Sequence, residues 1–164
     1  MFDDEILTLA QSVLEACRAR SWRLATAESC TGGLVAAALT AIAGSSDVVE
    51  RGFVTYSNQA KSELLGVSAE IIAAHGAVSA ETTAAMAHGA IARAPVDLAI
   101  SVTGIAGPGG ATPTKPVGLV LFGLAGRDGR CRTERRDFAG DRSAIRQAAV
   151  LRALELLDAE ARST

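Results

Sequence analysis

The feature that most constrains the fold of this 164-residue chain is a polar, glycine-rich turn at residues 26–33, Thr-Ala-Glu-Ser-Cys-Thr-Gly-Gly. The short apolar run that leads into it, residues 22–27, is typical of a buried strand. The Ala-rich run that follows, residues 34–43, has the length of a helix, and Gly44 suits the position that closes one. The turn therefore predicts a strand that passes directly into a helix.

Strands and helices alternate along the chain until two strands follow each other near the C-terminus. The other predicted elements are strands at 48–57, 97–102, 117–125 and 131–138 and helices at 4–19, 58–65, 68–74, 79–94 and 142–159. Asp128-Gly129 favours a hairpin between the last two strands. No repeat, linker or low-complexity tract interrupts the pattern. We therefore predict a single domain over residues 1–164, a three-layer α/β/α sandwich with a mixed, mostly parallel sheet.

Composition and charge argue against several classes of protein. Hydrophobic residues make up 49% and charged residues 21% of the chain, which is unlike a disordered protein. The net charge of -2 argues against a surface that binds nucleic acid by releasing counterions. The acidic N-terminus and the lack of a long apolar run predict neither a secretory signal nor a membrane span, so we expect a cytoplasmic protein. Cys17, Cys30 and Cys131 lie far apart, which supports neither a disulfide framework nor a metal site.

A second polar, glycine-rich junction, residues 101–110, also follows a predicted buried strand. Loops at the carboxyl ends of parallel strands face one crevice, so we expect residues 26–33 and 103–110 to line one pocket. The helix after Gly33 would add unpaired N–H groups and a positive dipole end, which favour an anion or an oxyanion beside Ser29. The alternative is that Ser29 or Thr31 only caps that helix while the glycines ease the turn.

Hydrolysis of an amide or ester needs a nucleophile, a base and donors for the oxyanion. The chain has two histidines, His75 and His88, and neither stands in a recognisable triad order. A lysine can be the base when burial lowers its pKa, and Lys61 follows Tyr56 by five residues. With Asn58 as the predicted N-cap, Lys61 falls in the first turn of a helix, where a cation opposes the dipole.

Two alternatives stay open at this point. Lys61 could be an ordinary solvated lysine, as most lysines are. As a base it should be partly desolvated, and a close Glu28 carboxylate would raise its pKa. The loop at 104–110 matches neither a Walker A motif nor a dinucleotide fingerprint. Its glycines could present N–H groups to a phosphate, with Lys115 or Arg142 completing the charge, or it could be a plain turn beside a surface arginine.

Several motifs together resemble one known family, the CinA C-terminal domain family. The resemblance covers nearly the whole chain, and its motifs occur in order. They are T-A-E-S-C-T-G-G at 26–33, A-G-S-S at 43–46, R-G-F-V-T-Y-S-N-Q-A-K at 51–61, H-G-A-V-S at 75–79, S-V-T-G-I-A-G-P at 101–108, K-P-V-G at 115–118 and G-D-R at 140–142.

The resemblance implies hydrolysis of nicotinamide mononucleotide to nicotinate mononucleotide and ammonia. It does not imply a metal, and we expect neither a metal nor a cofactor. It implies a small nucleotide as substrate, neither nucleic acid nor membrane as partner, and a homo-oligomer. Ser29 is the implied nucleophile, Lys61 the base and Tyr56 its partner, while Ser46 of A-G-S-S is a second candidate nucleophile. The expected substrate-binding residues are Glu28, Thr31, Gly32, Ser45, Asn58, Thr103, Gly104, Gly107 and Arg142.

The chain departs from the family pattern in two ways. Gly109 stands where many relatives carry an acidic residue after G-I-A-G-P. Two-domain members also carry an additional N-terminal domain resembling molybdopterin-binding proteins, whereas this sequence begins with the helix that precedes the deamidase-like region, so functions of that domain do not transfer. A competing interpretation is a catalytically silent nucleotide-binding or interaction module, because a fold does not guarantee its chemistry.

Overall fold

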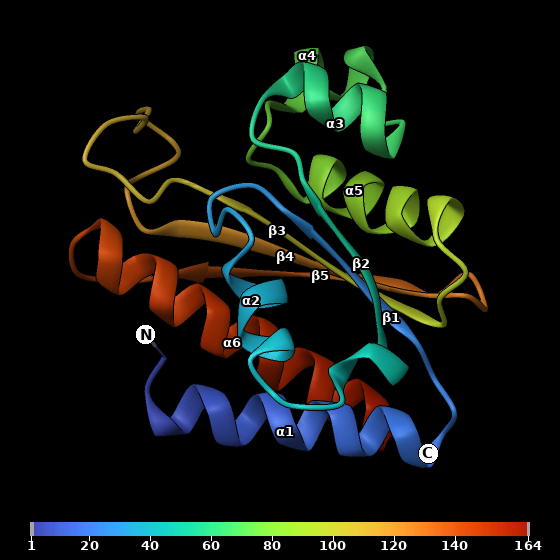
Figure 1. Cartoon of the computed structure of the whole chain (residues 1–164). Coiled ribbons are helices and arrows are strands. Elements are labelled where there is room, and N and C mark those ends of the chain that lie inside the picture. Colours follow the sequence, from blue (N-terminus) through green and yellow to red (C-terminus); the bar gives the residue numbers. More distant parts are fainter. Residues whose placement is uncertain (1, 164) are drawn as a thin grey trace.

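The computed structural model describes residues 2–163 as a five-stranded sheet between two layers of helices (Figure 1). The strands are β1 (Leu24–Glu28), β2 (Val49–Val54), β3 (Leu98–Gly104), β4 (Leu119–Gly126) and β5 (Cys131–Asp137). Their order is β2-β1-β3-β4-β5. β2 and β3 both run parallel to β1, and β4 and β5 complete the sheet as an antiparallel edge. The predicted three-layer α/β fold with a mixed sheet is confirmed.

The helices divide between the two faces of the sheet (Figure 1). On one face lie α1 (Asp4–Ala19), α2 (Leu34–Thr40) and α6 (Arg142–Arg162), and on the other lie α3 (Asn58–Leu65), α4 (Ala69–His75) and α5 (Ala80–Arg93). Along β3, Leu98 and Ile100 join the core under α1 and α6, whereas Ala99 joins the core under α5. This alternation is the period of two expected for a strand buried on both faces.

Two predicted boundaries were wrong near the first strand and helix. β1 begins at Leu24, and Trp22 lies outside it, with the Arg20 guanidinium 3.8 Å from its ring centroid. Helix α2 ends at Thr40, so Gly44 does not close it. With φ of +80°, Gly44 instead precedes a short 3-10 helix, η1 (Ser45–Asp47). This left-handed conformation is one that glycine adopts without strain.

A serine or aspartate side chain caps each α-helix within residues 2–163 except α2. Asp3, Ser68, Ser79 and Asp141 each accept a backbone N–H from the first turn of their helix. The predicted cap of α3 was wrong by one residue, because Ser57 is the N-cap and Asn58 is the first helical residue. Such a hydroxyl supplies the acceptor that a helix N-terminus lacks.

The C-terminal half follows the predicted pattern with small shifts. The hairpin between β4 and β5 turns at residues 127–130, and the Gly129 N–H donates to the Gly126 carbonyl at 3.1 Å. Helix α6 runs three residues beyond its predicted end at Ala159. Within residues 2–163, no helix combines the length and the apolar character that crossing a membrane requires.

Candidate active site

The polar turn after β1 lies at the carboxyl ends of the parallel strands. The Ser29 N–H donates to the Val102 carbonyl of β3 at 2.8 Å, and the Thr55 N–H, just after β2, donates to the Glu28 carbonyl at 2.8 Å. These bonds continue the parallel pairing of β1 with both neighbours. Residues 26–33 and 103–110 follow the carboxyl ends of the parallel β1 and β3 and therefore lie at one edge of the sheet, while a pocket lined by both stays a prediction.

Ser29 and Lys61 meet at this edge. The Lys61 ammonium nitrogen, Nζ, lies 3.1 Å from Ser29 Oγ and donates to the Thr55 carbonyl at 2.8 Å. The Lys61 residue is 1% exposed and Ser29 is 9% exposed. Burial lowers the pKa of Lys61 below 10.5, against a smaller opposing effect of Cys30. The predicted desolvation of Lys61 is confirmed, and it makes the neutral amine easier to form.

Glu28 is the last residue of β1 and is fully buried, and its side chain lies at the N-terminus of α2. Its carboxylate accepts the N–H groups of Gly33, Val35 and Ala36 at 3.0, 3.1 and 2.9 Å. The interpretation of Ser29 or Thr31 as the cap was therefore wrong: the N-cap position is Gly33, with φ of +97° and no side-chain cap. Because Glu28 already fills the anion site at this helix end, that end is not free for a substrate anion.

Tyr56 contacts Arg142 rather than Lys61. Arg142, the first residue of α6, donates to the Tyr56 hydroxyl at 2.7 Å and to the Gly107 carbonyl at 2.8 Å. Tyr56 is 59% exposed. We expected Tyr56 to contact the Lys61 amine. The amine instead donates to the backbone carbonyl of Thr55, the residue before Tyr56. Arg142 thus joins three segments at the site: the end of β2, the loop after β3 and the start of α6.

Arg146 is a site residue that the sequence interpretation missed. From the second turn of α6 it donates through Nε to the Cys30 carbonyl and through Nη2 to the Thr31 carbonyl, both at 3.1 Å. One guanidinium therefore holds two consecutive carbonyls of the loop that carries Ser29. Its position four residues after Arg142 was an available signal, because residues at that spacing share a helix face.

The remaining candidates at this edge have mostly structural contacts. The buried Thr103 hydroxyl donates to the Ala77 carbonyl at 3.0 Å. A side chain on Gly104 would meet the Leu119 carbonyl oxygen at 2.7 Å, so close packing against β4 requires glycine there. Gly32 has φ of +61°, Asn58 is exposed, and the Thr31 hydroxyl is buried with no hydrogen-bond partner among the described residues.

Ser45 and Ser46 lie at the opposite edge of the sheet. They belong to η1, which enters β2 at its amino end, whereas Ser29 follows the carboxyl end of the parallel β1. The length of β1 separates the two positions, so Ser46 cannot replace Ser29 as the partner of Lys61. The sequence held a signal for this, because residues 45–47 precede the predicted strand at 48–57 whereas Ser29 follows the one at 22–27, and turns before and after parallel strands lie at opposite edges.

The charges around Ser29 have no acidic partners. Within residues 2–163, no carboxylate lies within 4.0 Å of the cationic nitrogens of Lys61, Arg142 or Arg146. All three donate to neutral oxygens instead. This edge therefore combines a buried hydroxyl–amine pair with positive charge, an arrangement that suits nucleophilic attack on an anionic substrate.

Comparisons with known proteins find relatives that match nearly the whole chain. The family model described as CinA C-terminal domain matches residues 6–161. A protein of Escherichia coli K12 named nicotinamide-nucleotide amidohydrolase PncC is 50% identical over 157 residues, covering 96% of this chain and 95% of its own length. The protein of that name from Enterobacter agglomerans is 52% identical over 151 residues and covers 92% of both chains.

Longer relatives and solved structures extend the likeness. A CinA-like protein of Mycolicibacterium gilvum is 55% identical over 134 residues, which are 82% of this chain but 32% of that protein. The crystal structure of the competence/damage inducible protein CihA from Agrobacterium tumefaciens superimposes with a TM-score of 0.94 at 48% identity, covering 97% of each chain.

Proposed function

This chain belongs to the CinA C-terminal domain family, and from that premise we propose that it hydrolyses the carboxamide of nicotinamide mononucleotide to give nicotinate mononucleotide and ammonia. Relatives named for nicotinamide-nucleotide amidohydrolysis align with 92% and 96% of this chain. The observation that carries the proposal is the buried pair of Ser29 Oγ and Lys61 Nζ, 3.1 Å apart.

Acylation would begin with the neutral Lys61 amine. The amine accepts the Ser29 hydroxyl proton while Oγ attacks the carboxamide carbon, which forms a tetrahedral intermediate with a negative oxygen. Lys61 then returns the proton to the amide nitrogen. The C–N bond breaks, ammonia leaves, and the nicotinoyl group remains as an ester on Ser29. The Thr55 carbonyl, 2.8 Å from Nζ, supports this step by fixing the amine toward Oγ.

Deacylation would use the same base on a water molecule. Lys61 accepts a proton from water, the resulting hydroxide attacks the ester carbon, and the proton returns to Ser29 Oγ as the ester bond breaks. Nicotinate mononucleotide and free Ser29 result, so the two half-reactions together consume one water. Every proton transfer passes through Lys61, so no histidine is needed.

Arg142 is our candidate for binding the substrate phosphate, together with backbone N–H groups of a glycine-rich loop. Its two hydrogen-bond acceptors, the Tyr56 hydroxyl and the Gly107 carbonyl, orient the guanidinium without neutralising it. A phosphate could therefore pair with a cation that is already in place. Tyr56, exposed beside it, is proposed to contact the nucleotide.

We also propose that the protein acts in the cytoplasm as a homo-oligomer, without metal or cofactor and without binding nucleic acid. The large hydrophobic side chains that residues 2–163 leave exposed are Val54, Tyr56 and Leu64, at 49%, 59% and 46%. All three lie in the continuous segment that runs from the end of β2 through α3. Light scattering of the purified protein tests self-association, and a monomeric mass would contradict it.

The activity is tested by measuring ammonia release from nicotinamide mononucleotide by the purified protein. We expect release that survives chelator treatment and is lost in Ser29→Ala. Free nicotinamide and the riboside serve as control substrates, and both should react poorly because they lack the phosphate. A wild-type protein that binds the mononucleotide but releases no ammonia would favour the alternative, a catalytically silent binding module.

A further inference from the structure

The turn that follows Ser29 leaves two backbone donors without an acceptor, the N–H groups of Cys30 and Thr31. The Gly32 N–H donates to the Ser29 carbonyl at 3.0 Å and closes the turn. Within residues 2–163, no other residue accepts either N–H, and of the two donors the Cys30 N–H is the one directly after Ser29. A backbone donor in a largely buried turn normally has a partner, so an unpaired one marks a place where an acceptor can arrive. The residue directly after a nucleophile is where enzymes with a strand-to-helix nucleophile turn place an oxyanion donor.

A chain of peptide groups connects this donor to Arg146. The guanidinium donates to the Thr31 carbonyl, and the amide group of the same peptide is the Gly32 N–H. That N–H in turn donates to the Ser29 carbonyl, whose own peptide carries the free Cys30 N–H. Hydrogen bonds linked in this way polarise one another, each strengthening the next by about 10–30%.

The second bond of Arg146 fixes the donor residue itself. Nε holds the Cys30 carbonyl at 3.1 Å, so the carbonyls of both central residues of the turn are bound by one planar group on α6. No carboxylate within residues 2–163 is paired with Arg146, so no ion pair offsets its charge beside the turn. Cys30 is 6% exposed and Ser29 is 9% exposed, so the turn is largely buried.

We propose that Arg146 is a positioning residue that holds and polarises the turn so that the Cys30 N–H binds the oxyanion formed on the carboxamide oxygen. Arg146 does not touch the substrate; its charge reaches the oxyanion through the peptides of the turn. The inference rests on the proposed function for its substrate, but it concerns a residue to which neither the family motifs nor the predicted site assigned a role.

The proposal separates Arg146 from Arg142, one turn earlier on the same helix. An interaction that forms only as charge develops lowers kcat when removed, whereas uniform binding raises KM. Removing one oxyanion donor costs about 10²–10³ in kcat, so loss of a residue that only polarises and positions that donor should cost about tenfold to a hundredfold. Arg146→Ala should therefore lower kcat with KM changed by less than about threefold, while Arg142→Ala should mainly raise KM.

The test compares Arg146→Lys, Arg146→Gln and Arg146→Ala for ammonia release, with circular dichroism and melting temperature as folding controls. Lysine keeps the charge and one donor, whereas glutamine keeps a neutral donor. We expect kcat to fall in the order wild type, Lys, Gln, Ala. A Gln variant as active as the Lys variant, or an Ala variant with unchanged kcat, would overturn the proposal. If the Ala variant does not fold, the Lys and Gln variants still decide.

A second measurement separates this inference from the proposed substrate. When Ser29 Oγ attacks the phosphorus of a fluorophosphonate, negative charge develops on the phosphoryl oxygen before fluoride leaves. That oxygen needs the same donor, so the rate of Ser29 labelling should fall in the same order. If wild-type protein is labelled but releases no ammonia, the proposed substrate is wrong, and the labelling rates alone test the proposed role of Arg146. Equal labelling of the wild-type, Lys and Gln proteins would reject the role of Arg146, and so would a wild-type Ser29 that is not labelled.

Discussion

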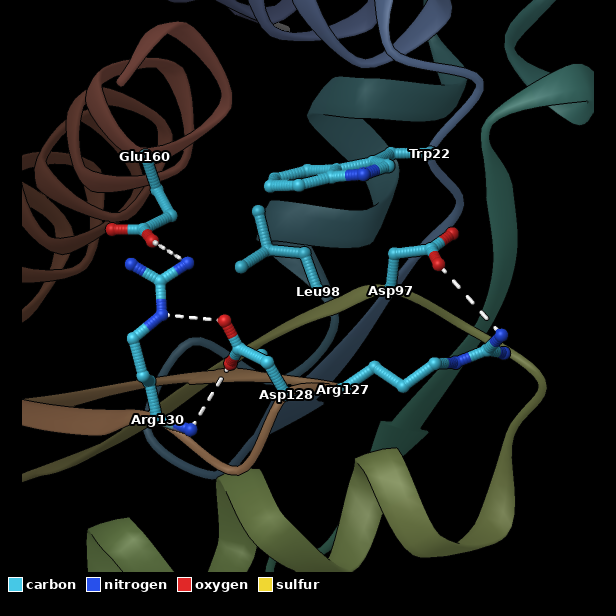
Figure 2. Close-up of a pocket in the computed structure, with 8 residues that line it drawn as sticks. Trp22, Asp97, Leu98, Arg127, Asp128, Arg130 and Glu160 are labelled. Carbon is cyan, nitrogen blue, oxygen red and sulfur yellow. Dashed lines mark hydrogen bonds and ion pairs between the residues drawn. The ribbon is translucent and has the colours of Figure 1, made fainter. Parts of the chain in front are cut away.

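Both edges of the sheet carry cationic side chains, but these side chains contact carboxylates at one edge and neutral oxygens at the other. At the amino edge, a cavity of about 320 Å³ is lined by Trp22, Leu98 and several charged residues (Figure 2). There Arg127 lies 3.8 Å from Asp97, and Arg130 pairs with Asp128. At the carboxyl edge, Lys61, Arg142 and Arg146 donate to hydroxyl and carbonyl oxygens.

This difference indicates where a ligand would gain from binding. A carboxylate beside an arginine cancels most of its field, so the amino-edge cavity offers an anion little net attraction. Neutral acceptors fix the direction of a cation without cancelling its charge. The carboxyl edge therefore holds positive charge ready for an anionic group, and it holds that charge beside the only lysine–serine pair within residues 2–163 that hydrogen bonds join.

The largest expected effect is loss of the pair itself. Ser29→Ala and Lys61→Ala should each lower kcat by about 10³-fold or more, because residues that act as one unit lose their effect together. The double variant should be little slower than either single one. Near-normal ammonia release by Lys61→Ala would refute the pair. Activity lost in Ser46→Ala but kept in Ser29→Ala would place the chemistry at the other edge and break the comparison.

The second effect is a pH dependence set by Lys61. The amine works as a base in its neutral form, so kcat/KM should rise about tenfold per pH unit below the Lys61 pKa and level off above it. Burial lowers this pKa, so the plateau should begin below pH 10.5. The Cys30 thiol cannot produce this plateau, because burial raises its pKa to about 12 and a rate set by its thiolate would keep rising up to that pH. A rate that falls as pH rises from 6 to 9 would mean that the ammonium form is the active one.

Much of the carboxyl edge could be predicted from the sequence because its signals are local. The strand, polar turn and helix around Ser29 follow from residue pattern, and parallel strands place their following loops at one edge. Because neither histidine stands in a triad order, Lys61 was the predicted base, and it lies beside Ser29 in the structure. These steps needed only the order of elements and the chemistry of side chains.

The errors came from contacts that sequence order does not encode. Glu28 caps a helix that begins six residues later, by folding back across the turn. Arg146 reaches the Cys30 carbonyl across 116 positions of the chain. Ser57 and Asn58 are both good caps, and only the backbone geometry distinguishes them. Tyr56 was paired with Lys61 by proximity in sequence, although its hydroxyl lies with Arg142.

The third effect concerns substrate binding at the carboxyl edge. Arg142→Ala should raise KM for nicotinamide mononucleotide about tenfold, equivalent to about 1.4 kcal/mol, with kcat nearly unchanged. The phosphate would lose its charged partner, while the Ser29–Lys61 pair would remain. Initial rates over a range of substrate concentrations separate the two constants. An unchanged KM would remove Arg142 from the site, and a lower kcat at unchanged KM would assign it to the chemical step.

The smallest effect should come from the matched arginine at the amino edge. The Arg127 side chain is 61% exposed and pairs with Asp97 at 3.8 Å, an arrangement that salt screens strongly. Arg127→Ala should therefore leave kcat and KM within about twofold of wild type, since surface changes away from a site rarely matter.

Raising the ionic strength sharpens the contrast between the two edges. In wild type and in Arg127→Ala, kcat/KM should fall with added salt to the same extent, because both retain the unpaired cations that attract the substrate. In Arg142→Ala the fall should be shallower. Equal salt dependence in all three proteins would mean that the unpaired cations do not attract the substrate, and the two edges would then differ in structure but not in function.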